Sequence, residues 1–158
     1  MIKDVTVNNN EDDGIYLTGT GITVENANIK NNELGFNIGG VAENNEITLA
    51  GDIFITNNGI GFYTDPEFKP QGTVYVTGNL NSNRNKIGLL GASENFTLAV
   101  GGSYLGKSGK SGSGSLTACD NTVDIDNFGG ITFEGSDYTC ETKVGTNLPE
   151  CKPCPGCL

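Results

Sequence analysis

Residues 53–62 read IFITNNGIGF, and residues 29–38 read IKNNELGFNI. Each stretch is a short apolar strand that runs into asparagine and is followed by glycine and an apolar-x-apolar segment. The glycine element begins at Gly14, Gly35 and Gly59, and it occurs again at 86–89, with lysine first, and at 130–133. Recurrence at a period of about 20 to 27 residues is typical of solenoid proteins.

Two further elements recur in the same order. One is a strand that ends in asparagine, and the other is an apolar-Thr-apolar segment with Tyr75 replacing threonine once. Alternate residues of a strand face opposite sides, so the apolar ones are expected to point inward and stacked coils to share one core. The strands ending in asparagine are 5–8, 29–31, 53–57, 80–83 and 123–127, and the threonine segments are 22–24, 47–49, 74–76, 96–98, 116–118 and 138–140.

Together these elements predict an all-β fold. We expect a right-handed single-stranded parallel β-helix, a solenoid with three short strands per coil and about five to six coils. Asparagines at the same corner of successive coils are expected to stack and to hydrogen-bond. The alternative is a β-sandwich, which predicts hairpin turns. The sequence has one Asn-Gly pair, Asn58-Gly59, and the repeat already explains it.

The strand-Asn-x-x-Gly-apolar-x-apolar pattern resembles the parallel β-helix repeats of the pectin-lyase-like superfamily, including its non-catalytic surface proteins and adhesins. Residues 127–131 also resemble the Gly-Gly-x-Ile repeats of bacterial polymorphic outer-membrane proteins. The resemblance covers residues 5–140 and implies a fold more than a function. Residues 11–14 resemble the Asp-Asp element of polygalacturonases, but the chain has no histidine and a single arginine, Arg84. We therefore expect no catalytic residues.

The predicted domains are a β-helix over residues 1–140, with a Gly/Ser-rich loop insertion at 101–114, and a cysteine-rich segment over 141–158. That segment is interpreted as a cap or as the start of a truncated following module. Cys119 and Cys140 lie one coil apart, near equivalent places on adjacent coils, and are expected to form a disulfide. The pairing of the remaining cysteines, Cys151, Cys154 and Cys157, stays open.

Charge and composition narrow the function classes. The formal charge is −10, with 9 basic and 19 acidic residues, so a basic face for nucleic acid is not expected. No apolar run approaches the length of a membrane span. Clustered cysteines and the N-glycosylation sequon at Asn95 indicate an extracellular or cell-surface location. The start at Met1, directly before repeat-like sequence, suggests a fragment or a processed product.

Two motifs for small ligands are weak. Residues 101–108 match the phosphate-loop pattern G-x-x-x-x-G-K-S, but the Gly/Ser-rich sequence that follows cannot begin the required helix. No cofactor is expected. If a metal binds, Ca²⁺ is the expected ion, and Asp120, Asp124 and Asp126 are its candidate ligands, with Asp124 and Asp126 on one outer face. An acidic, solvated strand explains these three residues as well.

Two sets of surface residues bear on function. Threonines 23, 48, 97, 117 and 139 are expected to form one outward column with Tyr75, as in ice-binding solenoids, although threonine is also simply a good strand residue. The predicted function is a non-enzymatic extracellular structural or adhesive module of a larger surface or filament-forming protein, with other copies or neighbouring domains as end-to-end partners. The alternative is a carbohydrate-binding or polysaccharide-degrading domain that uses Tyr16, Tyr63 or Tyr75.

Overall fold

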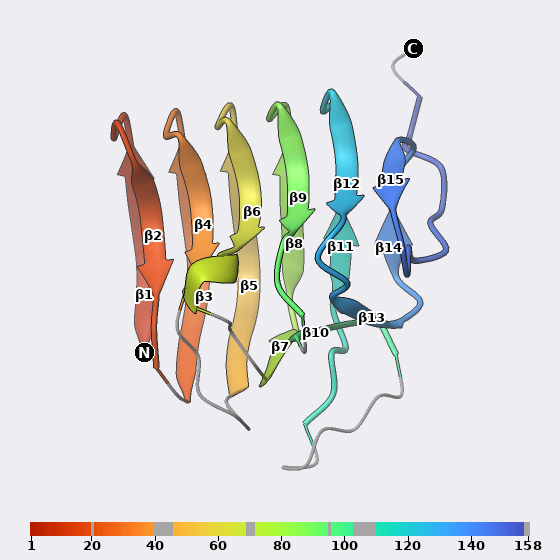
Figure 1. The fold of residues 1–158 in the computed structure, drawn as a ribbon. Helices are drawn as coiled ribbons and strands as arrows, with labels where there is room; N and C mark the ends of the chain where they lie inside the picture. The colour runs from red at the N-terminus through yellow and green to blue at the C-terminus, as the bar shows by residue number, and fades with distance from the viewer. Residues whose placement is uncertain (20, 40–45, 69–71, 95, 103–109, 157–158) are drawn as a thin grey trace.

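The computed structural model describes residues 1–19, 21–39, 46–68, 72–94, 96–102 and 110–156, and its elements are β-strands and one short 3-10 helix (Figure 1). Every pair of strands in the described residues is parallel. The prediction of an all-β protein with parallel strands is therefore confirmed. The elements are β1 (Ile2–Asn8), β2 (Asp13–Leu17), β3 (Ile22–Lys30), β4 (Leu34–Ile38), β5 (Glu46–Thr56), β6 (Ile60–Thr64), η1 (Pro66–Phe68), β7 (Gly72–Val76), β8 (Asn79–Asn83), β9 (Ile87–Gly91), β10 (Phe96–Val100), β11 (Ser115–Thr117), β12 (Val123–Asn127), β13 (Thr132–Gly135), β14 (Tyr138–Thr139) and β15 (Lys143–Gly145).

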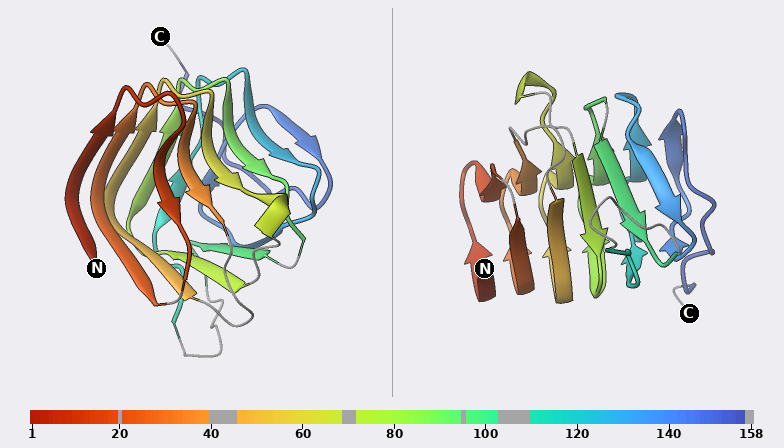
Figure 2. Two further views of the ribbon diagram at one scale, coloured as in Figure 1. Left: turned by 60° about the vertical axis from the view of Figure 1, so that its left-hand side comes forward. Right: turned by 90° about the horizontal axis from the view of Figure 1, so that it is seen from below.

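The chain passes alternately through two sheets. One has nine strands and curls around the molecule, and the other has six strands in the order β15-β12-β9-β6-β4-β2 (Figures 1 and 2). One pass through both sheets is called a rung. Rungs 1 to 3 are β1–β2, β3–β4 and β5–β6, and rungs 4 to 6 are β7–β9, β10–β12 and β13–β15. Each rung pairs with the next, so segments far apart in sequence lie side by side.

The core lies between the two sheets and consists of columns of apolar side chains. In the nine-stranded sheet, Val24, Leu49, Val76 and Val100 are in register, and none is more than 1% exposed. In the six-stranded sheet Phe36 pairs with Phe62, and their rings stack with centroids 6.0 Å apart. The alternation of apolar residues along each strand predicted these inward columns.

The strands of rungs 2 and 3 are longer than predicted. The threonine segment and the next strand, expected to be separate, form one strand in β3 and again in β5. Each strand changes direction at a residue with a left-handed backbone, Asn26 (φ 56°) in β3 and Gly51 (φ 64°) in β5. Asparagine and glycine tolerate this conformation, so the sheet bends without ending the strand.

After the insertion at 101–114 the predicted order of elements is wrong by one place. Residues 123–127 pair with β9 of the six-stranded sheet, whereas they were assigned to the strands that end in asparagine. Residues 116–117 take that place instead by pairing with β8, and Thr132–Gly135 pairs with β10. All three elements share the same apolar-x-apolar pattern, so the sequence alone does not tell which of them follows residues 101–114.

The single threonine column is also wrong. Thr23 and Thr48 do lie in register with Tyr75, but the next residue in that column is Ala99. Thr117 pairs with Thr139 in a different column. Tyr75 is 1% exposed, and its hydroxyl donates to Glu46 at 3.2 Å. Interruption of the column leaves no continuous threonine surface over these strands.

A column of glycines sets how closely the rungs of the six-stranded sheet approach. Register places Gly35 beside Gly61 and Gly61 beside Gly88, so the equivalent glycines in rungs 3 and 4 lie two residues later than the repeat predicted. A Cβ atom at Gly35 would lie 2.6 Å from the Gly61 carbonyl oxygen and would also collide with Ile55. Glycine is needed at Gly35 for close packing, not for a left-handed backbone.

Gly35→Ala is expected to destabilise the protein, because the added methyl group meets backbone that cannot move without shifting the next rung. Overpacking of this kind costs about 1–3 kcal/mol. Urea denaturation followed by circular dichroism measures the loss. The matched control is Gly156→Ala, where no atom lies within 4 Å of the new Cβ. Equal stability of the two variants would contradict the close approach at Gly35.

Candidate functional site

The most continuous polar feature is an asparagine ladder at the corner that precedes the six-stranded sheet. Asn32 donates to Asn58 Oδ1 through its backbone N–H at 2.9 Å and its side-chain Nδ2 at 3.1 Å. Asn58 donates to Asn85 Oδ1 in the same way, at 2.8 and 3.1 Å. Each asparagine thus satisfies backbone groups that the corner would otherwise leave unpaired. The members, one per rung, are Asn10, Asn32, Asn58, Asn85 and Asn121.

This ladder confirms the expected hydrogen bonding between corner asparagines. Its members are not the residues that end the predicted strands but lie one residue later in rungs 2 and 3 and two residues later in rungs 1 and 4. Asn31 and Asn57 instead take the left-handed conformation, both with φ 57°. The first residue of the Asn-Asn pair turns the chain and the second bonds to the next rung, and on the exposed side of the corner Asn31 Nδ2 also donates to Asn9 Oδ1 at 3.1 Å.

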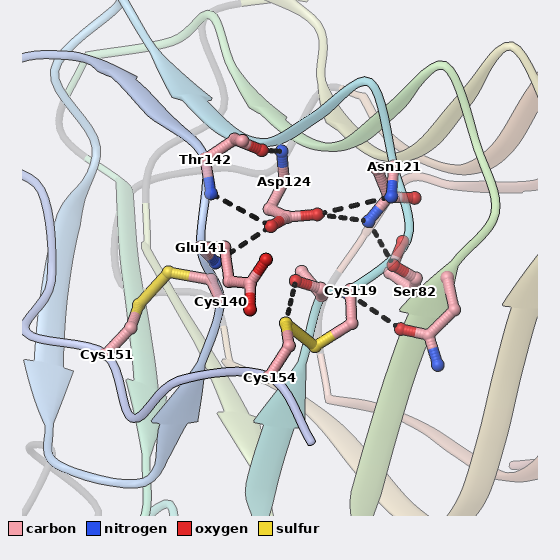
Figure 3. The surroundings of a disulfide bond; sticks show 11 residues. Ser82, Cys119, Asn121, Asp124, Cys140, Glu141, Thr142, Cys151 and Cys154 are labelled. Carbon is pink, nitrogen blue, oxygen red and sulfur yellow. Dashed lines mark hydrogen bonds between the residues drawn. A yellow bond between two sulfur atoms is a disulfide. The ribbon is translucent and has the colours of Figure 1, made fainter. Parts of the chain in front are cut away.

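The ladder ends on a buried carboxylate, Asp124 (Figure 3). Asn121 donates to Asp124 Oδ1 through its backbone N–H at 3.3 Å and its Nδ2 at 3.0 Å. The backbone N–H groups of Glu141 and Thr142 donate to Oδ2 at 2.8 and 3.0 Å. Asp124 is 2% exposed and lies beside Gly88, at the rung 5 place of the glycine column. Four donors converge on a group that can only accept.

The expected placement of Asp124 on an outer face with Asp126 is therefore wrong. Asp124 points inward and both of its oxygens are engaged, whereas Asp126 is half-buried and Asp120 is exposed. Within the residues that the structure describes, no group of three or more Cys, Asp or Glu side chains is arranged to hold a metal ion. The three aspartates are not brought together as a Ca²⁺ site.

Two disulfides join the last rungs to the tail (Figure 3). Cys119 pairs with Cys154 and Cys140 pairs with Cys151, with Cα–Cα distances of 5.9 and 5.4 Å. Between them, Lys152 donates its N–H to Tyr138 O at 2.8 Å and accepts from the Cys140 N–H at 3.1 Å. The tail thus adds one bridge to β14, and Leu148 packs against the core.

The expected Cys119–Cys140 disulfide is wrong, and the register explains why. Thr117 pairs with Thr139, so Cys140 lies opposite Ala118 and not opposite Cys119. A shift of one residue turns a side chain to the other side of a strand. Both cysteines therefore bond to the tail. Cys157 lies outside the described residues.

A second cluster lies on the outer face of the six-stranded sheet. Tyr16, Asn37 and Tyr63 are in register on β2, β4 and β6. Asn37 Nδ2 donates to both oxygens of Asp13, at 3.2 and 3.3 Å, and Asn37 is 4% exposed while its Oδ1 has no hydrogen-bond partner among the described residues. With Asp65, these residues are called the tyrosine face. Tyr75, the third tyrosine considered, belongs to the other sheet.

Burial and negative charge govern the ionisation of the tyrosine face. Partial burial raises the pKa of the Asp13 carboxyl, an effect that the hydrogen bond from Asn37 opposes. Burial also raises the pKa of the Tyr16 and Tyr63 hydroxyls, and the nearby Asp65 carboxylate adds to both shifts. At neutral pH both tyrosines keep their hydroxyl protons. The face therefore presents aromatic rings, phenolic donors and carboxylate acceptors.

Neither site includes the predicted glycosylation and phosphate-loop residues. Asn95 lies outside the described residues, as do residues 103–108 of the phosphate-loop match. Among the residues that are described, no helix has the length and apolar character needed to cross a membrane. Comparison with protein-family models, with curated proteins and with solved structures finds no match.

Sequence reasoning missed the role of Asp124 and the tyrosine face as a unit. One signal for Asp124 was present, because it takes the place of glycine in a column otherwise occupied by Gly35, Gly61 and Gly88. A small residue replaced by a carboxylate at an inward place implies a fixed set of donors around it. That signal is visible only when the strand register is known. The repeat aligned residues 59 and 86 with Gly35, two residues before the true partners Gly61 and Gly88.

Asp124→Asn is expected to lower the free energy of unfolding by about 1–3 kcal/mol, because either orientation of the amide turns an NH₂ group toward two N–H donors. The matched control is Asp126→Asn, two residues along the same strand, where the described residues show no such set of backbone donors. Thermal and urea denaturation measure both variants. An Asp124→Asn protein as stable as its control would show that the ladder does not need a terminal anion.

Proposed function

We propose that the chain is a short right-handed parallel β-helix, with three short strand segments per coil in about five to six coils, like the repeats of the pectin-lyase-like superfamily. We further propose that it acts as a non-enzymatic, extracellular structural or adhesive module of a larger surface or filament-forming protein. The observation that supports this most is the unbroken ladder from Asn10 to Asp124, which links five successive rungs.

Rigidity along the stack is the property that a spacer or display module needs. The ladder joins each rung to the next by side-chain hydrogen bonds, in addition to the backbone bonds between parallel strands. Outward side chains of adjacent rungs are then held about 4.8 Å apart. Such an array can change its surface residues without changing the elements that hold it together.

The closed end of the stack supports an extracellular location. Two disulfides in one short segment indicate an oxidising compartment. They are nested, since the Cys140–Cys151 loop of 11 residues lies inside the Cys119–Cys154 loop of 35 residues. A covalent loop at one end keeps the last rungs attached when force is applied along the chain.

This arrangement makes a mechanical prediction. When the full chain is pulled by its two ends in a single-molecule force experiment, the oxidised protein is expected to unfold with a resolvable force peak. Reduction is expected to lengthen the unfolded chain by about 120 Å, because 35 residues join the extensible contour at about 3.5 Å each. An oxidised chain that extends without a resolvable peak would contradict the structural role.

Paired variants test the nesting of the two disulfides. Cys119→Ser with Cys154→Ser is expected to add about 80 Å under oxidising conditions, from the part of the outer loop that lies outside the inner one. Cys140→Ser with Cys151→Ser is the matched control and is expected to add nothing, because the outer disulfide still closes the loop. Equal lengthening of both would show that the pairing differs.

Carbohydrate binding is the second proposed function, and the tyrosine face favours it. Tyr16 and Tyr63 lie two strand spacings apart, about 10 Å, with Asn37 between them and Asp13 beside them. Aromatic rings provide apolar faces for sugar rings, and carboxylates accept hydrogen bonds from sugar hydroxyls. The tyrosine face is the specific observation that distinguishes this candidate from a purely structural role.

A glycan array probed with the full chain tests this second function. Binding is expected to fall at least tenfold in Tyr16→Ala and in Tyr63→Ala, because each variant removes one ring of the pair. The control is Phe128→Ala, an exposed aromatic residue (64% exposed) outside the tyrosine face. Absence of binding to any glycan, or an equal loss in the control, would reject carbohydrate binding at this face.

A further inference from the structure

The edge formed by β1 and β2 leaves part of the core uncovered. Within the described part of the chain β1 pairs only with β3, and β2 pairs only with β4. The inward residues of β1 are only half-buried, whereas their partners in rung 2 are at most 3% exposed. The core therefore continues to this edge without a covering layer. The half-buried residues are Ile2, Val5 and Val7, and their partners are Val24, Ala27 and Ile29.

The asparagine ladder also reaches this edge unfinished. In rungs 2 to 5 each ladder Oδ1 accepts hydrogen bonds from the asparagine of the preceding rung, as Asn32 Oδ1 does from Asn10 N and Nδ2 at 3.0 and 2.9 Å. Asn10 itself is exposed, and none of the described residues donates to its Oδ1. The edge thus presents an amide oxygen at the place where rungs 2 to 5 receive donors.

A second row of polar residues, on the outer face of the nine-stranded sheet, ends at the same edge. It alternates carboxylate and amide: Asn26 Nδ2 donates to Asp4 Oδ1 at 2.8 Å, Asp52 N–H donates to Asn26 Oδ1 at 3.1 Å, and Asn79 Nδ2 donates to Asp52 Oδ1 at 2.8 Å. The same pattern beyond Asp4 would have the Asp4 N–H donate to a side-chain oxygen of the adjoining strand, as the Asp52 N–H does to Asn26 Oδ1. A carboxamide side chain next to β1 would satisfy both rows, because it can donate to Asn10 Oδ1 and can accept from the Asp4 N–H.

A second copy of the chain fits this edge poorly. Two β1 edges related by a two-fold axis would run antiparallel, which breaks the ladder register. They would also bring together Glu11, Asp12 and Asp13 of two chains that each carry a net charge of −10. The opposite end of the stack does not offer a matching surface, because the tail and the Cys140–Cys151 disulfide lie against β14.

We propose that the β1–β2 edge is a docking surface for a neighbouring module of parallel β-structure. Its terminal strand lies parallel to β1, its apolar side chains cover Ile2, Val5 and Val7, and an asparagine of its last corner donates to Asn10 Oδ1. This inference rests on the proposed structural function and identifies the partner by its chemistry, a strand with asparagine at the ladder place.

An added rung tests the proposal on the full chain. A copy of residues 1–22 is joined before Met1, because Ile2 lies opposite Val24 and a copy of this length places each copied residue opposite its original. In the matched control extension, the residues that copy Asn9 and Asn10 are alanine. The extended chain is expected to melt at least about 4 °C above the control, and the amides of Val5 and Val7 are expected to exchange hydrogen at least tenfold more slowly.

Equal melting temperatures of the two extensions, with unchanged exchange at Val5 and Val7, would overturn the proposal. Sedimentation velocity of the unmodified chain is expected to show a monomer; a dimer abolished by Val5→Lys would make a second copy the occupant and overturn it as well. The force experiment distinguishes failure of the docking proposal from failure of the proposed structural function. If the oxidised chain resists force but the added rung does not dock, only this inference fails.

Discussion

The structure depends on repeating one hydrogen-bonded corner at the same position along the strands in rungs 1 to 5. Parallel strands about 4.8 Å apart pair only if successive passes of the chain keep the same cross-section. The asparagine ladder enforces this at the corner, because one amide side chain both accepts from the preceding rung and donates to the next, as Asn58 does between Asn32 and Asn85. Core packing alone has no direction along the strand and would tolerate a slip of two residues.

The hydrogen bonds of the ladder all run in one direction, and this direction explains why the ladder ends on a carboxylate. Donors point toward the C-terminal end of the stack, so the last member must find an acceptor that needs no further partner. Asp124 is that acceptor, and it also receives the N–H groups of Glu141 and Thr142. Beyond it the asparagine pattern stops and the tail is attached by disulfides. Covalent closure replaces the hydrogen-bonded repeat where the repeat ends.

Features that depend on the repeat period could be predicted from the sequence. Features that depend on the register between neighbouring strands could not. The repeat of about 20 to 27 residues was sufficient to predict parallel strands, and alternating apolar residues predicted inward columns such as Val24, Leu49 and Val76. The glycine column was placed two residues early, and Cys140 one residue away from its true opposite, Ala118. Register is set by contacts between rungs, and those contacts are not visible within any single repeat. The tyrosine face was missed for the same reason.

Different residues stabilise the fold and face the solvent, and this limits where a binding surface can evolve. Corner asparagines and inward residues hold the rungs together, so only outward side chains are free to change without loss of stability. Tyr16 and Tyr63 of the tyrosine face lie on the outward side in rungs 1 and 3, away from the disulfides. A module docked on β1 and β2 would extend the column of Tyr16 by one residue.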